Sequence, residues 1–180
     1  PTFLQLNHAG PSHSKALSGH LPVSSSALSL DELPRTFYGP TYELSIPEIE
    51  DLVTKFANAA SWAQKAGFDG VEIHSAHAYL GASFLSRAWN KRQDAYGGDL
   101  KNRCRFTVEI IRAIKERLGQ DFPVGVRING AEYGVEKGLT SDETQGIARI
   151  LEEAGASHLN ISAYGYGDYV RVVQPEQLFY

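Results

Sequence analysis

Two histidines and a tyrosine lie within six residues of one another near the middle of the chain. His74, His77 and Tyr79 follow the short apolar segment 70–74 (GVEIH). Imidazole N–H groups can donate hydrogen bonds to a substrate carbonyl and stabilise negative charge as it develops. A tyrosine hydroxyl can deliver a proton if a pocket holds it near the acceptor atom. The three residues therefore predict a site that addresses one small polar group.

The same residue types also allow other interpretations. A single histidine is more often structural than catalytic, and Tyr79 could be a core aromatic residue whose hydroxyl is hydrogen-bonded. His74 and His77 could ligate a metal ion, although no third histidine or carboxylate ligand is evident near them in the sequence. On residue types alone, the catalytic, structural and metal interpretations all remain open.

Four short segments rich in valine, isoleucine or aromatic residues are typical of buried parallel strands: residues 2–7, 70–74, 124–128 and 158–162. Polar residues gather at their carboxyl ends: Gln5, Asn7, His8, His74, His77, Arg127, Asn129 and Ser162. The active sites of TIM barrels are built at this edge. A doubly wound sheet would also bind its ligand there, but no G-x-G-x-x-G motif follows any of these strands.

Three helices are predicted between the strands. Ser45-x-x-Glu48 and Thr140-x-x-Glu143 are capping-box patterns, and each precedes apolar residues at helical spacing. The remaining helix is expected over about 102–118. Glycines at 67, 119 and 155 follow the three helices, as C-terminal caps do. Strands that alternate with helices of this length indicate βαβ units and a parallel sheet.

A TIM (β/α)8 barrel needs eight such units and typically about 250 residues. This sequence of 180 residues has four strands and three complete helices, begins with Pro1 and contains no methionine. We therefore interpret residues 1–180 as a single, incomplete domain from the central part of an α/β barrel. Half a barrel would leave two strand edges that must be covered.

The composition excludes several function classes. A net charge of −4 provides no basic surface for nucleic acid or anionic membranes. No apolar run approaches the roughly 20 residues that span a bilayer. One cysteine, Cys104, can form neither an internal disulfide nor an iron–sulfur cluster within this stretch. It fits a reducing compartment, so a cytoplasmic location is expected.

The motifs resemble those of the Old Yellow Enzyme (NADH:flavin oxidoreductase) family. Residues 5–10 (QLNHAG) resemble its third-strand motif, QLxHAGR. Residues 70–105 resemble its fourth-strand signature, with paired histidines, a tyrosine two residues later, FLSP, N-x-R-x-D-x-YGG and N-R. Residues 122–129 (FPVGVRIN) resemble the fifth strand with its arginine, and residues 138–162 resemble the sixth unit. The resemblance implies strands 3 to 6 of a TIM barrel.

The resemblance also implies an activity: reduction of the activated C=C bond of α,β-unsaturated carbonyl compounds by FMN, with NADH or NADPH as electron donor. His74 and His77 would bind the activating oxygen. Tyr79 would protonate the α-carbon while reduced flavin gives hydride to the β-carbon. Gln5 would contact the pyrimidine side of the flavin and Arg127 its N1 and O2, and His74 completes the expected cofactor contacts. The expected partner is a small enone, no metal is expected, and a homo-oligomer is possible.

Several positions depart from the family pattern. Pro11 stands where arginine commonly follows HAG, residues 81–83 (GAS) replace Leu-x-Gln, and Arg87 replaces the proline of FLSP. These changes leave the substrate preference open. The polar residues of the long loop are interpreted as structural: Asn90, Arg92, Asp94, Tyr96, Gly97, Gly98 and Arg103. Tyr164, Tyr166 and Tyr169 are expected in a loop after the last strand. This loop either lines the mouth of a substrate site or is a packed structural loop.

Two further functions were weighed from the sequence. A metal-dependent barrel lyase or hydrolase would use His74 and His77 as ligands. A degenerate half-barrel without activity would serve as an assembly or interaction module. The phosphate-binding loops of TIM barrels follow strands seven and eight, which this sequence does not include.

Overall fold

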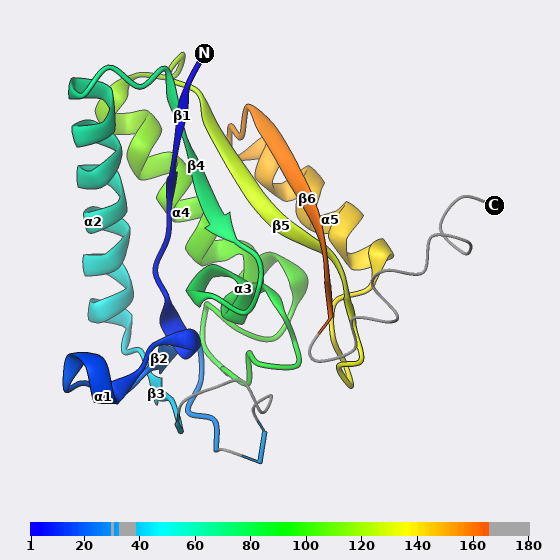
Figure 1. Cartoon of the computed structure of the whole chain (residues 1–180). Coiled ribbons are helices and arrows are strands. Elements are labelled where there is room, and N and C mark those ends of the chain that lie inside the picture. Colours follow the sequence, from blue (N-terminus) through cyan, green and yellow to red (C-terminus); the bar gives the residue numbers. More distant parts are fainter. Residues whose placement is uncertain (30, 33–38, 166–180) are drawn as a thin grey trace.

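The central element of the computed structural model is a four-stranded parallel sheet (Figure 1). The structure describes residues 1–29, 31–32 and 39–165. The strands are β1 (Phe3–Leu6), β4 (Gly70–Ser75), β5 (Val124–Tyr133) and β6 (His158–Gly165), and they pair in this order. The spatial order repeats the chain order, as in a barrel, whereas a doubly wound sheet reverses direction part of the way across.

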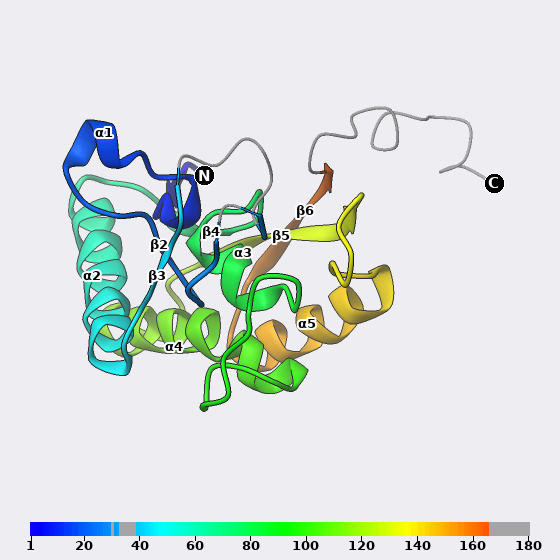
Figure 2. The same cartoon turned by 90° about the horizontal axis from the view of Figure 1, so that it is seen from below.

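Three long helices cover one face of this sheet. They are α2 (Ile46–Lys65), α4 (Leu100–Leu118) and α5 (Ser141–Glu153). Seen from below, they form an arc outside the strands (Figure 2). Strands inside and helices outside are the arrangement of part of a TIM barrel. No helix in the described part of the chain has both the length and the apolar character that crossing a membrane requires.

The predicted helix starts are confirmed by their caps. The Glu48 carboxylate accepts a hydrogen bond from the Ser45 backbone N–H at 2.8 Å, and the Thr140 hydroxyl accepts from the Glu143 N–H at 3.3 Å. Helix α4 begins two residues before the predicted start at 102. The reason is that Asp99 caps it, accepting from the Asn102 N–H at 2.8 Å.

The hydrophobic core lies between the sheet and these helices. One set of alternate strand residues is fully buried and faces the helices: Val71, Ile73, Val124, Val126 and Ile128. Four apolar residues of α4 are buried in the same core: Phe106, Ile110, Ile111 and Ile114. The other set of strand residues faces what would be the barrel interior, and it carries the polar side chains.

Strands β5 and β6 both extend beyond their predicted ends at 128 and 162. Their pairing continues to Tyr133 and Gly165 through a register shift between Asn129 and Ala131. The continuation was missed because it rests on backbone pairing and not on an apolar run. Tyr164, predicted to lie in a loop, is part of β6, while Tyr166 and Tyr169 lie outside the described residues.

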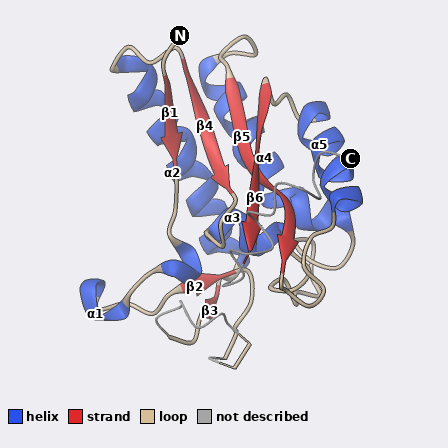
Figure 3. Ribbon diagram, turned by 45° about the vertical axis from the view of Figure 1, so that its right-hand side comes forward, coloured by secondary structure: helices blue, strands red, loops and turns tan. Residues whose placement is uncertain are grey.

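The two long loops contain short elements that the sequence did not indicate. The first holds η1 (Gly10–Ser12), α1 (Lys15–Ser18), β2 (Val23–Ser24) and β3 (Tyr42–Glu43); the second holds α3 (Leu80–Leu85). All six residues of α3 are buried, so this helix has no amphipathic pattern to detect. Together α3, β2 and β3 lie at the carboxyl ends of the strands (Figure 3).

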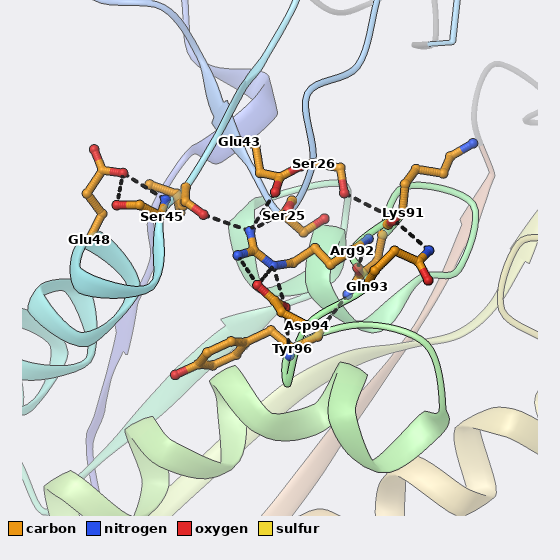
Figure 4. A network of polar contacts seen from close by, with 12 residues as sticks. Ser25, Ser26, Glu43, Ser45, Glu48, Lys91, Arg92, Gln93, Asp94 and Tyr96 are labelled. Atoms are coloured by element: carbon orange, nitrogen blue, oxygen red, sulfur yellow. Dashed lines mark hydrogen bonds and ion pairs between the residues drawn. The ribbon is translucent and has the colours of Figure 1, made fainter.

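The buried guanidinium of Arg92 fastens the two long loops together (Figure 4). It donates hydrogen bonds to the carbonyl oxygens of Ser25 (2.9 Å) and Leu44 (2.7 Å), and its Nη2 lies 2.6 Å from the Asp94 carboxylate. Asn90 similarly donates to two carbonyl oxygens of its own loop. The interpretation of these residues as structural is consistent with all of these contacts.

Candidate functional site

The predicted trio lies in a tight turn at the end of β4. His74 is in the strand, and its side chain is only 6% exposed. Two residues of the following turn, His77 (φ 55°) and Ala78 (φ 61°), adopt left-handed backbone conformations. For residues other than glycine this costs roughly 1–2 kcal/mol each. Such strain persists only where the surrounding structure imposes it, and it is common at functional sites.

The turn brings the three side chains together. The rings of His74 and His77 are 5.0 Å apart at 76°, and those of His74 and Tyr79 are 4.9 Å apart at 84°. His74 is therefore in contact with both partners in edge-to-face geometry. Tyr79 occupies the residue immediately before α3, so the position of this helix sets the position of the phenol.

The environment of His74 determines its protonation. Burial, reinforced by the neighbouring His77 and Arg127, lowers the pKa of His74 to about 4. Its Nδ1 accepts a hydrogen bond from the Ala76 N–H at 3.2 Å, so the neutral ring carries its hydrogen on Nε2. Within the described ranges, Nε2 makes no hydrogen bond. At neutral pH, His74 is thus an uncharged donor that is available to a ligand.

His77 is anchored to the two neighbouring strands. Its Nε2 lies 2.6 Å from the hydroxyl oxygen of Ser162 on β6, and its backbone N–H donates to Oδ1 of Asn129 on β5 at 3.1 Å. Burial, with a smaller contribution from the Arg127 charge, lowers the pKa of His77 as well. Both histidines are consequently neutral at physiological pH.

Arg127 lies beside His74 in the sheet, as the register of β4 and β5 shows. Its Nη2 is 3.4 Å from the Ser162 hydroxyl, so Ser162 connects Arg127 with His77. The Nε of Arg127 is buried and has no hydrogen-bond partner among the described residues. The sequence placed Ser162 at this edge without assigning it a role; only the fold shows that it joins two predicted site residues.

Gln5 lies one strand away from the trio, on β1. Its Nε2 donates to Glu72 Oε1 at 2.5 Å, and the other oxygen of Glu72 accepts from Asn160 Nδ2 at 3.2 Å. Glu72 precedes His74 by two residues on the same strand, so both face the barrel interior. Gln5 therefore belongs to a polar layer next to that of His74 and Arg127. Glu72 and Asn160 were not predicted, although their two-residue spacing from His74 and Ser162 was a usable signal.

Residues that could bind a metal ion were searched for in the same way. In residues 1–29, 31–32 and 39–165, no three or more His, Cys, Asp or Glu side chains are grouped so as to hold one. The ring nitrogens of the two site histidines instead contact protein groups, with Nδ1 of His74 bonded to Ala76 and Nε2 of His77 next to Ser162.

The sequence and the fold were compared with known proteins. The model of the NADH:flavin oxidoreductase / NADH oxidase family matches residues 2–178. The NADH oxidase of Thermoanaerobacter brockii is 41% identical over 177 residues, which cover 97% of this chain and 26% of the relative. The NADPH dehydrogenase of Clostridium acetobutylicum is 39% identical over 150 residues, covering 83% and 42% of the two chains.

A solved structure agrees with the sequence relatives. The Old Yellow Enzyme homologue from Zymomonas mobilis superposes with a TM-score of 0.76 at 30% identity and covers 88% of this chain and 46% of its own. The chain thus spans less than half the length of each of these three relatives. The predicted TIM-barrel fold is confirmed, as are FMN and a nicotinamide donor as the cofactors of the family. The strand order, the polar edge and these matches together show that the chain belongs to the NADH:flavin oxidoreductase family, which includes the Old Yellow Enzymes.

Proposed function

We propose that the protein to which this chain belongs reduces the activated C=C bond of α,β-unsaturated carbonyl compounds with NADH or NADPH through FMN. We further propose that residues 1–180 supply the carbonyl-binding and proton-donating groups as one part of the barrel domain. The observation that carries the proposal is the Nε2–H of neutral His74, which has no hydrogen-bond partner among the described residues. The centroids of the His77 and Tyr79 rings lie 5.0 and 4.9 Å from that of the His74 ring.

The residues at this edge fit a flavin. The buried Nε–H of Arg127 has no partner within the described ranges, and it can donate to a flavin oxygen or nitrogen. The fixed positive charge of Arg127 suits the anionic reduced ring. Gln5 has its amide nitrogen bonded to Glu72, which leaves its oxygen to accept from a ring N–H. When bound, FMN supplies the hydride chemistry that amino-acid side chains lack.

The two histidines would bind the carbonyl oxygen of the substrate. Nε2–H of His74 donates to this oxygen and so stabilises the negative charge that develops on it when the β-carbon is reduced. Because the pKa values of both histidines are lowered, they act as neutral donors and do not transfer their own protons to the oxygen at physiological pH. The proton that completes the reaction at the α-carbon then comes from the Tyr79 hydroxyl.

Replacing Tyr79 by phenylalanine in the full-length protein tests this assignment. Loss of the proton donor should slow re-oxidation of the reduced enzyme by an enone about 10²–10⁴-fold, while flavin reduction by NAD(P)H is largely kept. Stopped-flow measurement of the two half-reactions separates these effects. Tyr96→Phe is the matched control, because in the described part of the chain the Tyr96 hydroxyl bonds only to Glu109 on α4. Equal loss in both half-reactions of Y79F would contradict the assigned role.

The other features expected of the whole protein remain predictions. They are an enone as substrate, a possible homo-oligomer and a cytoplasmic location. The departures from the family pattern bear on the identity of the substrate. Size-exclusion chromatography of the full-length protein would measure its oligomeric state.

A further inference from the structure

Asn129 and Glu132 are two buried polar residues of β5, 0% and 6% exposed. Residues three apart in a regular strand point to opposite faces of the sheet. Here the register with β6 shifts between Asn129 and Ala131, so Gly130 is an extra residue in β5. The bulge brings the two side chains onto the same side, and Asn129 Nδ2 donates to Glu132 Oε1 at 3.2 Å.

The second carboxylate oxygen of Glu132 is occupied as well. It accepts from the Ser86 hydroxyl at 2.6 Å and from the Leu139 backbone N–H at 2.9 Å. Burial raises the pKa of the Glu132 carboxyl, and the hydrogen bonds from Ser86, Leu139 and Asn129 counteract this rise. Asn129 presents its amide nitrogen to Oε1 of Glu132. The amide oxygen of Asn129 is thereby directed the opposite way.

That oxygen accepts the backbone N–H of His77 at 3.1 Å. His77 is the first of the two left-handed residues in the strained turn that precedes Tyr79. The backbone of Asn129 is itself anchored, because its carbonyl oxygen accepts from the Thr144 hydroxyl on α5 at 3.0 Å. A continuous chain of hydrogen bonds therefore runs from Glu132 through Asn129 to the catalytic turn.

We propose that Glu132, acting through Asn129, is a positioning residue that holds the His77–Ala78 turn and so sets the places of the His77 ring and the Tyr79 hydroxyl. The catalytic consequence rests on the proposed function, whereas the structural consequence at the turn does not. Glu132 lies outside the trio and contacts neither histidine ring through any hydrogen bond that the structure shows.

Only a carboxylate satisfies all the donors around Glu132. A glutamine has one oxygen and one NH2 group. If its NH2 faced Asn129, the Asn129 amide would have to turn round and present its own NH2 to the His77 N–H. If its NH2 faced the other way, it would oppose the Leu139 N–H. An isosteric change thus breaks the chain of hydrogen bonds with little change in volume.

The experiment uses the full-length, flavin-loaded protein with four variants: N129A, E132Q, the double variant, and E143Q. Glu143 is the matched control, since it is a partly buried glutamate paired with Arg87 and Arg103, and none of its hydrogen bonds or ion pairs to described residues reaches the turn. The first measurement is hydrogen exchange of the His77 amide by residue-resolved mass spectrometry. We expect exchange about tenfold faster in N129A and E132Q and unchanged in E143Q.

The second measurement is re-oxidation of the reduced enzyme by an enone. We expect the rate to fall about tenfold in N129A and in E132Q, with no further fall in the double variant, because Glu132 acts through Asn129. Effects that multiply in the double variant would overturn the proposal. So would a His77 amide in E132Q that exchanges as in the parent protein. If N129A does not fold, the amide exchange and the re-oxidation rate of the isosteric E132Q, compared with those of E143Q, test the proposal.

Failure of the proposed function gives a different result. In that case the parent protein is not re-oxidised by enones at all, while the exchange measurement still reports on the chain of hydrogen bonds. Faster amide exchange in E132Q together with an unchanged enone rate would show that the turn is held by Glu132 but that its position does not govern the chemistry, and this too would overturn the proposal as stated.

Discussion

At the scale of single residues, burial next to a fixed cation controls the chemistry of the site. His74 is enclosed at the end of β4 beside Arg127, and this environment favours the neutral ring. The Ala76 N–H then selects the tautomer with hydrogen on Nε2. The result is a donor whose character does not change across the physiological pH range.

The lowered pKa of His74 predicts a pH dependence of stability. Between pH 6.5 and about 4 the unfolded state binds a proton on this histidine and the folded state does not. The free energy of unfolding of the full-length protein should therefore fall as the pH drops through this window, with His74 contributing about 2 kcal/mol. Urea titrations at pH 7 and pH 4.5 should show a smaller decrease in H74Q than in the parent protein. An equal decrease in H74Q, with the exposed-site variant His20→Gln as control, would contradict the assignment.

At the scale of elements, two of the departures from the family pattern, residues 81–83 and Arg87, have structural explanations. A Cβ at Gly81 would lie 2.4 Å from Oγ and 2.8 Å from Cα of Ser75, so glycine lets α3 pack directly on β4. The Ser83 hydroxyl accepts a hydrogen bond from the Ser25 N–H at 3.1 Å and so joins α3 to the first loop. Arg87 donates to the Lys137 carbonyl oxygen at 3.3 Å. These residues fasten elements around the site.

The contact between α3 and β4 predicts the effect of Gly81→Ala. The added methyl group must push α3 away from Ser75, and because Tyr79 immediately precedes α3 the phenol moves with it. We expect a loss of about 1–3 kcal/mol in the free energy of unfolding and slower re-oxidation by an enone. Thermal unfolding and stopped-flow kinetics measure the two effects. Gly39→Ala, where an added Cβ would meet no atom within 4 Å, should change neither. A fully active G81A would refute the link between helix and phenol.

At the scale of the whole molecule, both edges of the described sheet are open. Strands β1 and β6 each pair with one neighbour among the described residues, and Ile161 on β6 is 55% exposed. In the proposed function, the polar edge provides groups for the flavin ring and the substrate carbonyl. The phosphate sites of TIM barrels, however, are typically built after strands seven and eight. On this proposal the four described strands would supply only part of a complete FMN site.

Because the proposed FMN site is incomplete in these four strands, we expect the full-length protein to bind flavin and residues 1–180 alone not to bind it. A visible absorption spectrum of the full-length protein after desalting should show bound FMN, while residues 1–180 alone, mixed with FMN and desalted, should be colourless. Flavin retained by the short piece would mean that half of the barrel suffices for binding. Flavin absent from both would contradict the proposed function and return attention to His74 and His77 as metal ligands.

Local patterns in the sequence were enough to predict the main elements. The apolar segments 70–74 and 124–128 and the capping boxes at Ser45 and Thr140 all correspond to observed strands and helices. These signals are local because side-chain periodicity and capping depend on residues a few positions apart. The proximity of His74, His77 and Tyr79 could be predicted for the same reason.

The tertiary structure alone decided how these residues work. The bridge of Ser162 between His77 and Arg127 spans three strands. The bond between Asn129 and Glu132 accompanies the register shift between β5 and β6, which is a property of the strand pairing. Protonation of His74 depends on burial by distant segments. Such features arise from the register and packing of residues far apart in the chain, so the sequence by itself determined the fold and the trio, and only the assembled sheet determined their geometry and charge.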